Sequence, residues 1–134
     1  MRVARNAVAA LAAVGMALGT AVLVPGVATA ASYNGACGSG YGVVNRYDLI
    51  GGTVFLTYSR SSGLNCVVTV RDNPGPKLPM TAKVSRSDEL TWVEDMGDYG
   101  TYAGPVYRHA AGVCVDWGGA IDSDSVTVWR TNCG

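Results

Sequence analysis

Four cysteines set narrow limits on the fold of this 134-residue chain: Cys37, Cys66, Cys114 and Cys133. An even number of cysteines in a small exported protein predicts disulfide bonds, here two. A zinc site is the alternative, but zinc sites favour closely spaced cysteine pairs together with histidines. The spacings here are wide and the single histidine is His109. We therefore expect two disulfides, no metal site and no cofactor.

The N-terminal segment indicates that the chain is exported. Arg2 and Arg5 precede an uncharged apolar run from Ala7 to Val24, and Ala28-Thr29-Ala30 then offers a small-x-small cleavage site. This order is typical of a secretory signal peptide. A membrane anchor is the alternative, because the run approaches the span of a bilayer. The run is rich in alanine and glycine and a cleavage site follows it directly, so we expect cleavage before Ala31.

Removal of residues 1–30 as a signal peptide would leave residues 31–134, a length that suits a single secreted domain. The whole chain has ten basic and ten acidic residues. Loss of the two arginines of the signal peptide leaves eight basic and ten acidic residues, a net charge near −2. No cluster of Lys and Arg remains to neutralise phosphates, so we expect no nucleic-acid partner, and no membrane association after cleavage.

Residues 31–134 have the pattern of strands separated by turns. Thr53–Ser59 and Asn65–Asp72 are rich in β-branched residues and flank a Ser- and Gly-rich turn. This predicts a hairpin with one buried and one solvent-facing side. Only residues 85–96 offer a helical alternative. Further strands are expected within residues 40–50, 80–87, 90–93, 101–110, 111–117 and 125–132, with turns at 95–100 and 118–124. We predict an all-β fold, a small antiparallel β-sandwich or barrel.

Strand register predicts which cysteines pair. If the last two strands pair by their valines, Cys114 lies early in one strand beside Cys133, late in its antiparallel partner, and both project outward. In a meander of three strands, the start of the first strand meets the end of the second, which brings Cys37 near Cys66. Of the three possible connectivities we predict Cys37–Cys66 and Cys114–Cys133. Each bridge is worth about 3 kcal/mol in the chain-entropy model.

The stretch CVDWGG, residues 114–119, looks at first like the floor of an active site. Period-2 alternation instead places Val115 and Trp117 on one face of a strand and Asp116 on the other. We therefore expect Trp117 in the core. Asp116 is expected at the surface, or as a cap on a turn at Gly118-Gly119.

No residues form a recognisable catalytic motif. His109 is the only histidine that could act as the base of a serine hydrolase, and no GxSxG sequence accompanies it. Glu94, Asp95 and Asp98 could supply a carboxylate pair for glycoside hydrolysis, although acids beside a glycine turn are usually solvated. Asp122-Ser123-Asp124 matches only part of a calcium-binding loop. We expect no catalytic residues, no metal site and no enzymatic activity.

Several motifs, taken together, resemble one family. YNGACGSGYGVVN, GTVFLTY, NCVVTV, YAGPVY and CVDWGG occur in the order and spacing of the spore-associated protein A family of small secreted actinobacterial proteins. The resemblance includes all four cysteines, whereas residues 72–98 match only loosely. It implies export and association with aerial hyphae or spores, with spore or cell-wall components as partners. It implies no established enzymatic activity, and it leaves the oligomeric state open.

Two further binding roles remain open beside a structural role at the spore surface. Ten Trp and Tyr residues against one Phe suit a carbohydrate- or cell-wall-binding module, because Tyr and Trp combine an apolar ring with a polar group. Trp129, Tyr102 and Asp116 are the candidate ligand face. The weaker alternative is a small protease inhibitor that presents Lys77-Leu78 on a proline-braced loop.

Overall fold

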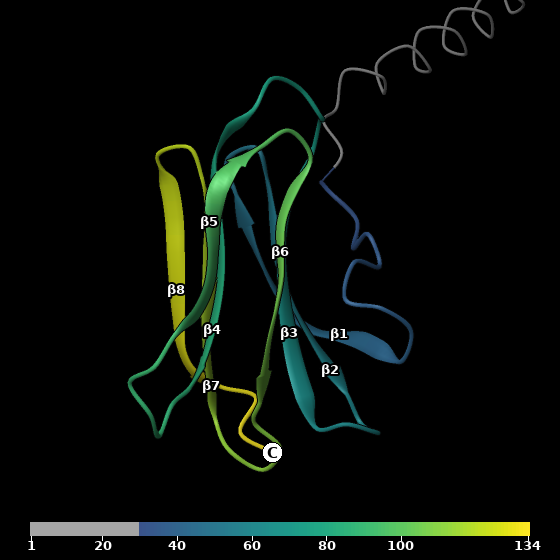
Figure 1. Cartoon of the computed structure of the whole chain (residues 1–134), viewed down its shortest axis with the longest axis vertical. Coiled ribbons are helices and arrows are strands. Elements are labelled where there is room, and N and C mark those ends of the chain that lie inside the picture. The colour runs from purple at the N-terminus through teal and green to yellow at the C-terminus, as the bar shows by residue number, and fades with distance from the viewer. Residues whose placement is uncertain (1–29) are drawn as a thin grey trace, which may run out of the picture.

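A computed structural model describes residues 30–134 of the chain, which form two packed antiparallel sheets (Figure 1). Their order is β1-β2-β3-β6 in the first sheet and β5-β4-β7-β8 in the second. The strands are β1 (Tyr41–Leu49), β2 (Gly52–Ser59), β3 (Leu64–Arg71), β4 (Leu78–Arg86), β5 (Val93–Tyr99), β6 (Tyr102–His109), β7 (Val115–Ile121) and β8 (Asp124–Thr131). The predicted all-β fold is confirmed as a sandwich. The predicted signal peptide, apart from its last residue, lies outside the described residues.

The core lies between the two sheets. Trp117, Val54, Leu56, Val67 and Val84 are fully buried there, so the prediction that Trp117 belongs to the core is confirmed. Thr69 also links the layers, since its hydroxyl donates a 2.8 Å hydrogen bond to the carbonyl of Thr81. Within residues 30–134 no helix is long and apolar enough to span a membrane.

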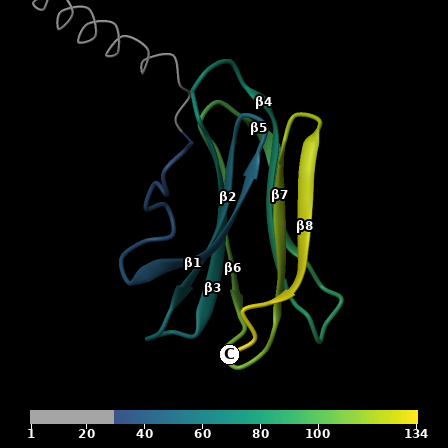
Figure 2. The ribbon, with the colours of Figure 1, turned by 180° about the vertical axis from the view of Figure 1, so that it is seen from behind.

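The β2–β3 hairpin is present as predicted, but the expectation of a solvent-facing side is wrong. Most residues of both strands are buried, on both faces. The segment 31–40 runs along the outer side of the first sheet and covers it, as both views show (Figures 1 and 2). Tyr33 packs edge-on against Phe55, with ring centroids 5.8 Å apart, above a small cluster with Val68 and Val70. The residues that precede β1 therefore bury the outer face of β2 and β3, which was expected to face solvent. We call residues 31–40 the covering segment.

The sequence 95–100, predicted to be a turn, is instead largely strand β5. Burial alternates along this strand, with Glu94, Met96 and Asp98 exposed and the intervening residues half-buried. The strand pairs with β4 over its whole length. Val93 and Tyr99 pack against the core, so pairing and burial override the turn preference of the local sequence. The helical alternative for residues 85–96 is wrong for the same reason.

The pair Gly118-Gly119 lies inside β7 and not in a turn, which corrects the prediction for residues 118–124. A Cβ atom on Gly119 would lie only 2.7 Å from the carbonyl oxygen of Thr81 in β4 and would also collide with Thr69 of the facing sheet. Glycine is needed here because backbone and facing sheet approach closely. The turn falls instead at Asp122 and Ser123, where Asp122 adopts a φ of 55°.

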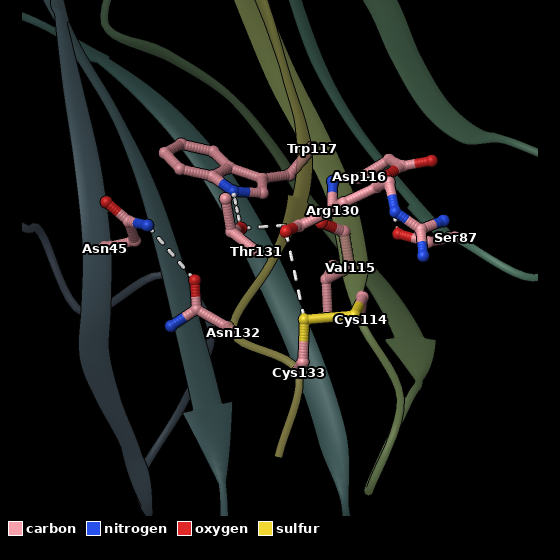
Figure 3. Close-up of a disulfide and its surroundings, with 10 residues drawn as sticks. All are labelled: Asn45, Ser87, Cys114, Val115, Asp116, Trp117, Arg130, Thr131, Asn132 and Cys133. Atoms are coloured by element: carbon pink, nitrogen blue, oxygen red, sulfur yellow. Dashed lines mark hydrogen bonds between the residues drawn. A yellow bond between two sulfur atoms is a disulfide. The ribbon is translucent and has the colours of Figure 1, made fainter.

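Both predicted disulfides, Cys37–Cys66 and Cys114–Cys133, are confirmed. The first ties the covering segment to β3, with a Cα–Cα distance of 6.1 Å, and both cysteines are buried. The second joins the residue before β7 to the tail after β8 (Figure 3). The valine-to-valine pairing from which it was predicted is wrong, because Val128 lies opposite Trp117 and Val115 lies opposite Thr131. The antiparallel pairing of β7 with β8 nevertheless brings the start of β7 beside the end of β8.

Candidate binding face

The most exposed tryptophan of the second sheet is Trp129 in β8. Its neighbours Val126 and Val128 pack toward the core, so alternation directs Trp129 outward, where 62% of the residue is exposed. The loop between β4 and β5 brings Trp92 against it, although β5 and β8 are opposite edges of the sheet. The two rings meet edge to face, with centroids 5.9 Å apart and an interplanar angle of 77°. We call this pair the tryptophan face.

A cation adjoins the tryptophan face. Lys83 of β4 places its Nζ 4.7 Å from the centroid of the Trp92 ring, within the range of a cation–π interaction. Neither Trp92 nor Lys83 is among the ligand-face residues predicted from the sequence. Alternation offered a signal for Trp92, since its neighbour Val93 belongs to the core and adjacent strand residues point to opposite faces.

Asp116 fixes the two segments that carry the tryptophan face, contrary to the expectation that its side chain lies at the surface. It is buried, with 6% of the residue accessible. Its Oδ1 accepts a 2.6 Å hydrogen bond from the Ser87 hydroxyl and a 2.8 Å bond from the Arg130 amide (Figure 3). These bonds join the β4–β5 loop to β8. Asp116 therefore holds in place the two segments that carry the tryptophans, and it is not an exposed ligand contact.

Further contacts hold the β4–β5 loop. The buried Ser85 hydroxyl donates a 2.7 Å hydrogen bond to the carbonyl of Thr91, which closes the loop on its own first strand. Arg86 pairs with Asp88 at 2.9 Å, and Glu89 pairs with Arg108 of β6. The hydrogen bond from Arg86 holds the pKa of Asp88 below its usual value. Trp92 is therefore the last residue of a loop that several hydrogen bonds and ion pairs hold in place.

Tyr102, the third residue of the predicted ligand face, does not join the tryptophan face. It begins β6 in the other sheet, pairs with Val70 and is 38% exposed. The structure therefore does not bring Trp129, Tyr102 and Asp116 together on one exposed surface. The loop proposed for protease inhibition is also less free than the sequence suggests. Lys77 is exposed, but Leu78 begins β4 and packs against the core.

The ionisable residues considered for catalysis either lie apart from one another or form hydrogen bonds that stabilise the fold. His109 is exposed at the end of β6. Asp95 accepts hydrogen bonds from the Tyr99 hydroxyl at 2.5 Å and from the Gly104 amide at 2.8 Å, and the first of these raises the pKa of Tyr99. Glu94 lies on the opposite face of the same strand. Within residues 30–134, no three His, Cys, Asp or Glu side chains are grouped to hold a metal ion.

Fold and face together define a small disulfide-bonded β-sandwich with an exposed tryptophan, Trp129, packed against the half-buried Trp92. The chain is 47% identical over 134 residues to the protein named Spore-associated protein A of Streptomyces coelicolor (strain ATCC BAA-471 / A3(2) / M145), a match that covers 94% of this chain and 86% of that protein. The chain therefore belongs to the spore-associated protein A family, which confirms the resemblance seen in its motifs. No protein-family profile and no solved structure matches it.

Proposed function

We propose that this chain is a secreted protein of the spore or hyphal surface, with a structural or interaction role and no catalytic activity. Its kinship with a protein named Spore-associated protein A is the observation that carries this proposal. The two disulfides support it, because such bonds persist in oxidising, extracellular surroundings. The N-terminal sequence supports export, since it has the order of a signal peptide.

Localisation tests the surface role. In the organism that encodes the chain, an antibody against residues 31–134 should label the surface of intact spores or aerial hyphae, and a mild wash should release protein with both disulfides formed. As a control, a chain without residues 1–30 should stay inside the cell. Labelling confined to the interior of the hyphae in the presence of residues 1–30 would contradict the proposal.

The absence of catalysis is tested with His109, the single histidine of the chain. Its side chain is exposed at a strand end, without a nucleophile motif nearby in the sequence. The variant His109→Ala should fold normally and keep its localisation. Peptidase, esterase and glycosidase assays should give the same background for the wild type and this variant. Turnover by the wild type that the substitution abolishes would overturn this part of the proposal.

A second candidate function is binding to cell-wall carbohydrate, and the tryptophan face is the observation that favours it. Exposed aromatic rings stack on the apolar faces of sugars, and the nearby Lys83 could serve anionic groups of a wall polymer. The rings are held by Asp116 and the β4–β5 loop, which lowers the entropic cost of binding.

A sedimentation assay with insoluble peptidoglycan tests this second function. Trp129→Ala should lower the bound fraction at least severalfold, because the variant removes one of the two rings. Tyr47→Ala is the matched control, since Tyr47 is 47% exposed in β1 of the other sheet. Equal binding by wild type and Trp129→Ala, or an equal loss in both variants, would argue against the tryptophan face as the ligand site.

A further inference from the structure

A cavity of about 650 Å³ opens at one end of the sandwich, on elements that the tryptophan face does not use. Its lining includes Val44 in β1, Tyr58 in β2 and Asn65 in β3 of the first sheet, Ala110 in the β6–β7 loop, and Asn132 and Cys133 in the tail after β8. Pockets of roughly 300–1,000 Å³ are typical of small-molecule sites. The volume is therefore sufficient for an organic ligand.

The cavity forms where the packed core ends. Tyr58 and Asn65 are the last paired residues of the β2–β3 hairpin. In β1 the strand register shifts between Val43 and Asn45, so Val44 stands at an irregularity. The Trp117 indole closes the core, since its Nε1 donates a 2.9 Å hydrogen bond to the Thr131 hydroxyl.

Covalent and polar bonds hold the walls of the cavity. Asn132 follows β8 with a φ of 51°, and its side-chain amide accepts a 3.1 Å hydrogen bond from the Asn45 amide (Figure 3). The Asn132 amide also donates a 3.3 Å hydrogen bond to the Val44 carbonyl. Cys133 is bonded to Cys114. The tail after β8 is thus tied to β1 of the other sheet and to the start of β7, and the cavity exists before any ligand enters.

The side-chain amide of Asn65 is a buried polar group in the lining of the cavity. Asn65 is 3% exposed, and its Nδ2 donates a 3.1 Å hydrogen bond to the Thr57 carbonyl. This bond fixes which end of the amide is the oxygen. No residue in the described range 30–134 donates a hydrogen bond to Asn65 Oδ1. A buried acceptor without a hydrogen-bond partner is unfavourable, so a ligand with a donor would bind here favourably.

We propose that this cavity binds a small neutral amphipathic molecule, whose apolar body lies among Val44, Tyr58 and Ala110 and whose single hydrogen-bond donor meets Asn65 Oδ1. No lining residue carries a charged side chain that would favour an ionic ligand. Mostly apolar walls with a few well-placed polar groups are the usual composition of such sites. Ligand binding in this cavity is independent of the surface role and of the tryptophan face, so an experiment can support or overturn it separately.

Fluorescence titration with N-phenyl-1-naphthylamine tests the proposal, because this neutral probe is apolar and has one N–H donor. The oxidised protein comprising residues 31–134 should enhance its emission saturably, with one probe bound per chain. The N-methyl derivative of the probe lacks the donor and should bind about tenfold more weakly, as expected for one lost hydrogen bond. The variant Asn65→Leu should remove this difference between the two probes.

A pair of neighbouring valines supplies a control that does not disturb the buried amide. Val43 and Val44 are 43% and 44% exposed, and only Val44 lines the cavity. Val44→Phe should therefore weaken probe binding at least tenfold, while Val43→Phe should leave it unchanged. The proposal is overturned if the wild type shows no saturable binding, if both probes bind equally, or if the two valine variants behave alike.

Discussion

The main-chain nitrogen of Ala31 lies 2.7 Å from Oδ1 of Asp72, to which it donates a hydrogen bond. Ala31, the first residue of the covering segment, is 9% exposed and belongs to the small apolar cluster with Phe55 and Val68. Cleavage before Ala31, as the N-terminal sequence predicts, would convert this amide into an α-ammonium group. The bond would then join two opposite charges, which strengthens a hydrogen bond. Processing at this position would thus anchor the new terminus on the first sheet.

The first prediction follows from this contact. N-terminal sequencing of the secreted protein should begin at Ala31, and Asp72→Asn should lower its free energy of unfolding by about 1.5–3 kcal/mol, as for a hydrogen bond to a charged group. In protein with two extra residues before Ala31, the same substitution should cost less, about 0.5–1.5 kcal/mol. Denaturant unfolding of the four proteins measures both effects. An equal cost in the two backgrounds would show that the terminal charge is not involved.

The second prediction concerns the two disulfides. Cys133 is exposed, whereas Cys37 and Cys66 are buried at 4% and 0% exposure, so a mild thiol should reduce Cys114–Cys133 first. Replacing Cys114 and Cys133 by serine should lower the free energy of unfolding by about 2–5 kcal/mol. Non-reducing peptide mapping follows the order of reduction, and thermal unfolding measures the loss. Earlier reduction of Cys37–Cys66 would contradict the role given to solvent access.

The third prediction concerns Asp116. Asp116→Ala should release both the Ser87 hydroxyl and the Arg130 amide, with a loss of about 1–3 kcal/mol in the free energy of unfolding. It should also loosen the contact between Trp92 and Trp129, which near-ultraviolet circular dichroism reports. Asp98→Ala is the control, since this carboxylate is exposed in β5 of the same sheet. Identical spectra for the two variants would show that Asp116 does not position Trp92 and Trp129.

The fourth prediction concerns the dependence of stability on pH. Hydrogen bonds from Arg46 and then Thr53 hold the pKa of Asp48 below its usual value of 3.8. A carboxyl group whose pKa is lower in the folded state stabilises the fold above pH 3.8, and the contribution is lost as the pH falls through the lowered pKa. Asp48→Asn should therefore flatten the fall in melting temperature on acidification below pH 4. An unchanged slope would show that the ion pair does not contribute to stability.

Local patterns in the sequence were sufficient to predict the all-β class, the β2–β3 hairpin, the burial of Trp117 and both disulfide pairings. Alternation of side chains decides which face of a strand meets the core, and strand order decides which ends lie together. Cys114 directly precedes β7 and Cys133 lies in the tail after β8, so the antiparallel pairing of these strands brings the two cysteines together. The order and direction of the strands are therefore sufficient to predict this cysteine pairing, without the exact register.

Only the tertiary structure decided what covers each sheet and which distant residues meet. The outer side of β2 and β3 is buried because segment 31–40 folds over it, which strand periodicity alone does not reveal. Gly118-Gly119 reads as a turn but serves a close approach between strand and facing sheet. Likewise Trp92 meets Trp129, Asp116 becomes buried, and Asn65 faces a cavity, because each position depends on contacts far along the chain. Periodicity determines direction within a strand, whereas packing between elements determines what each side chain touches.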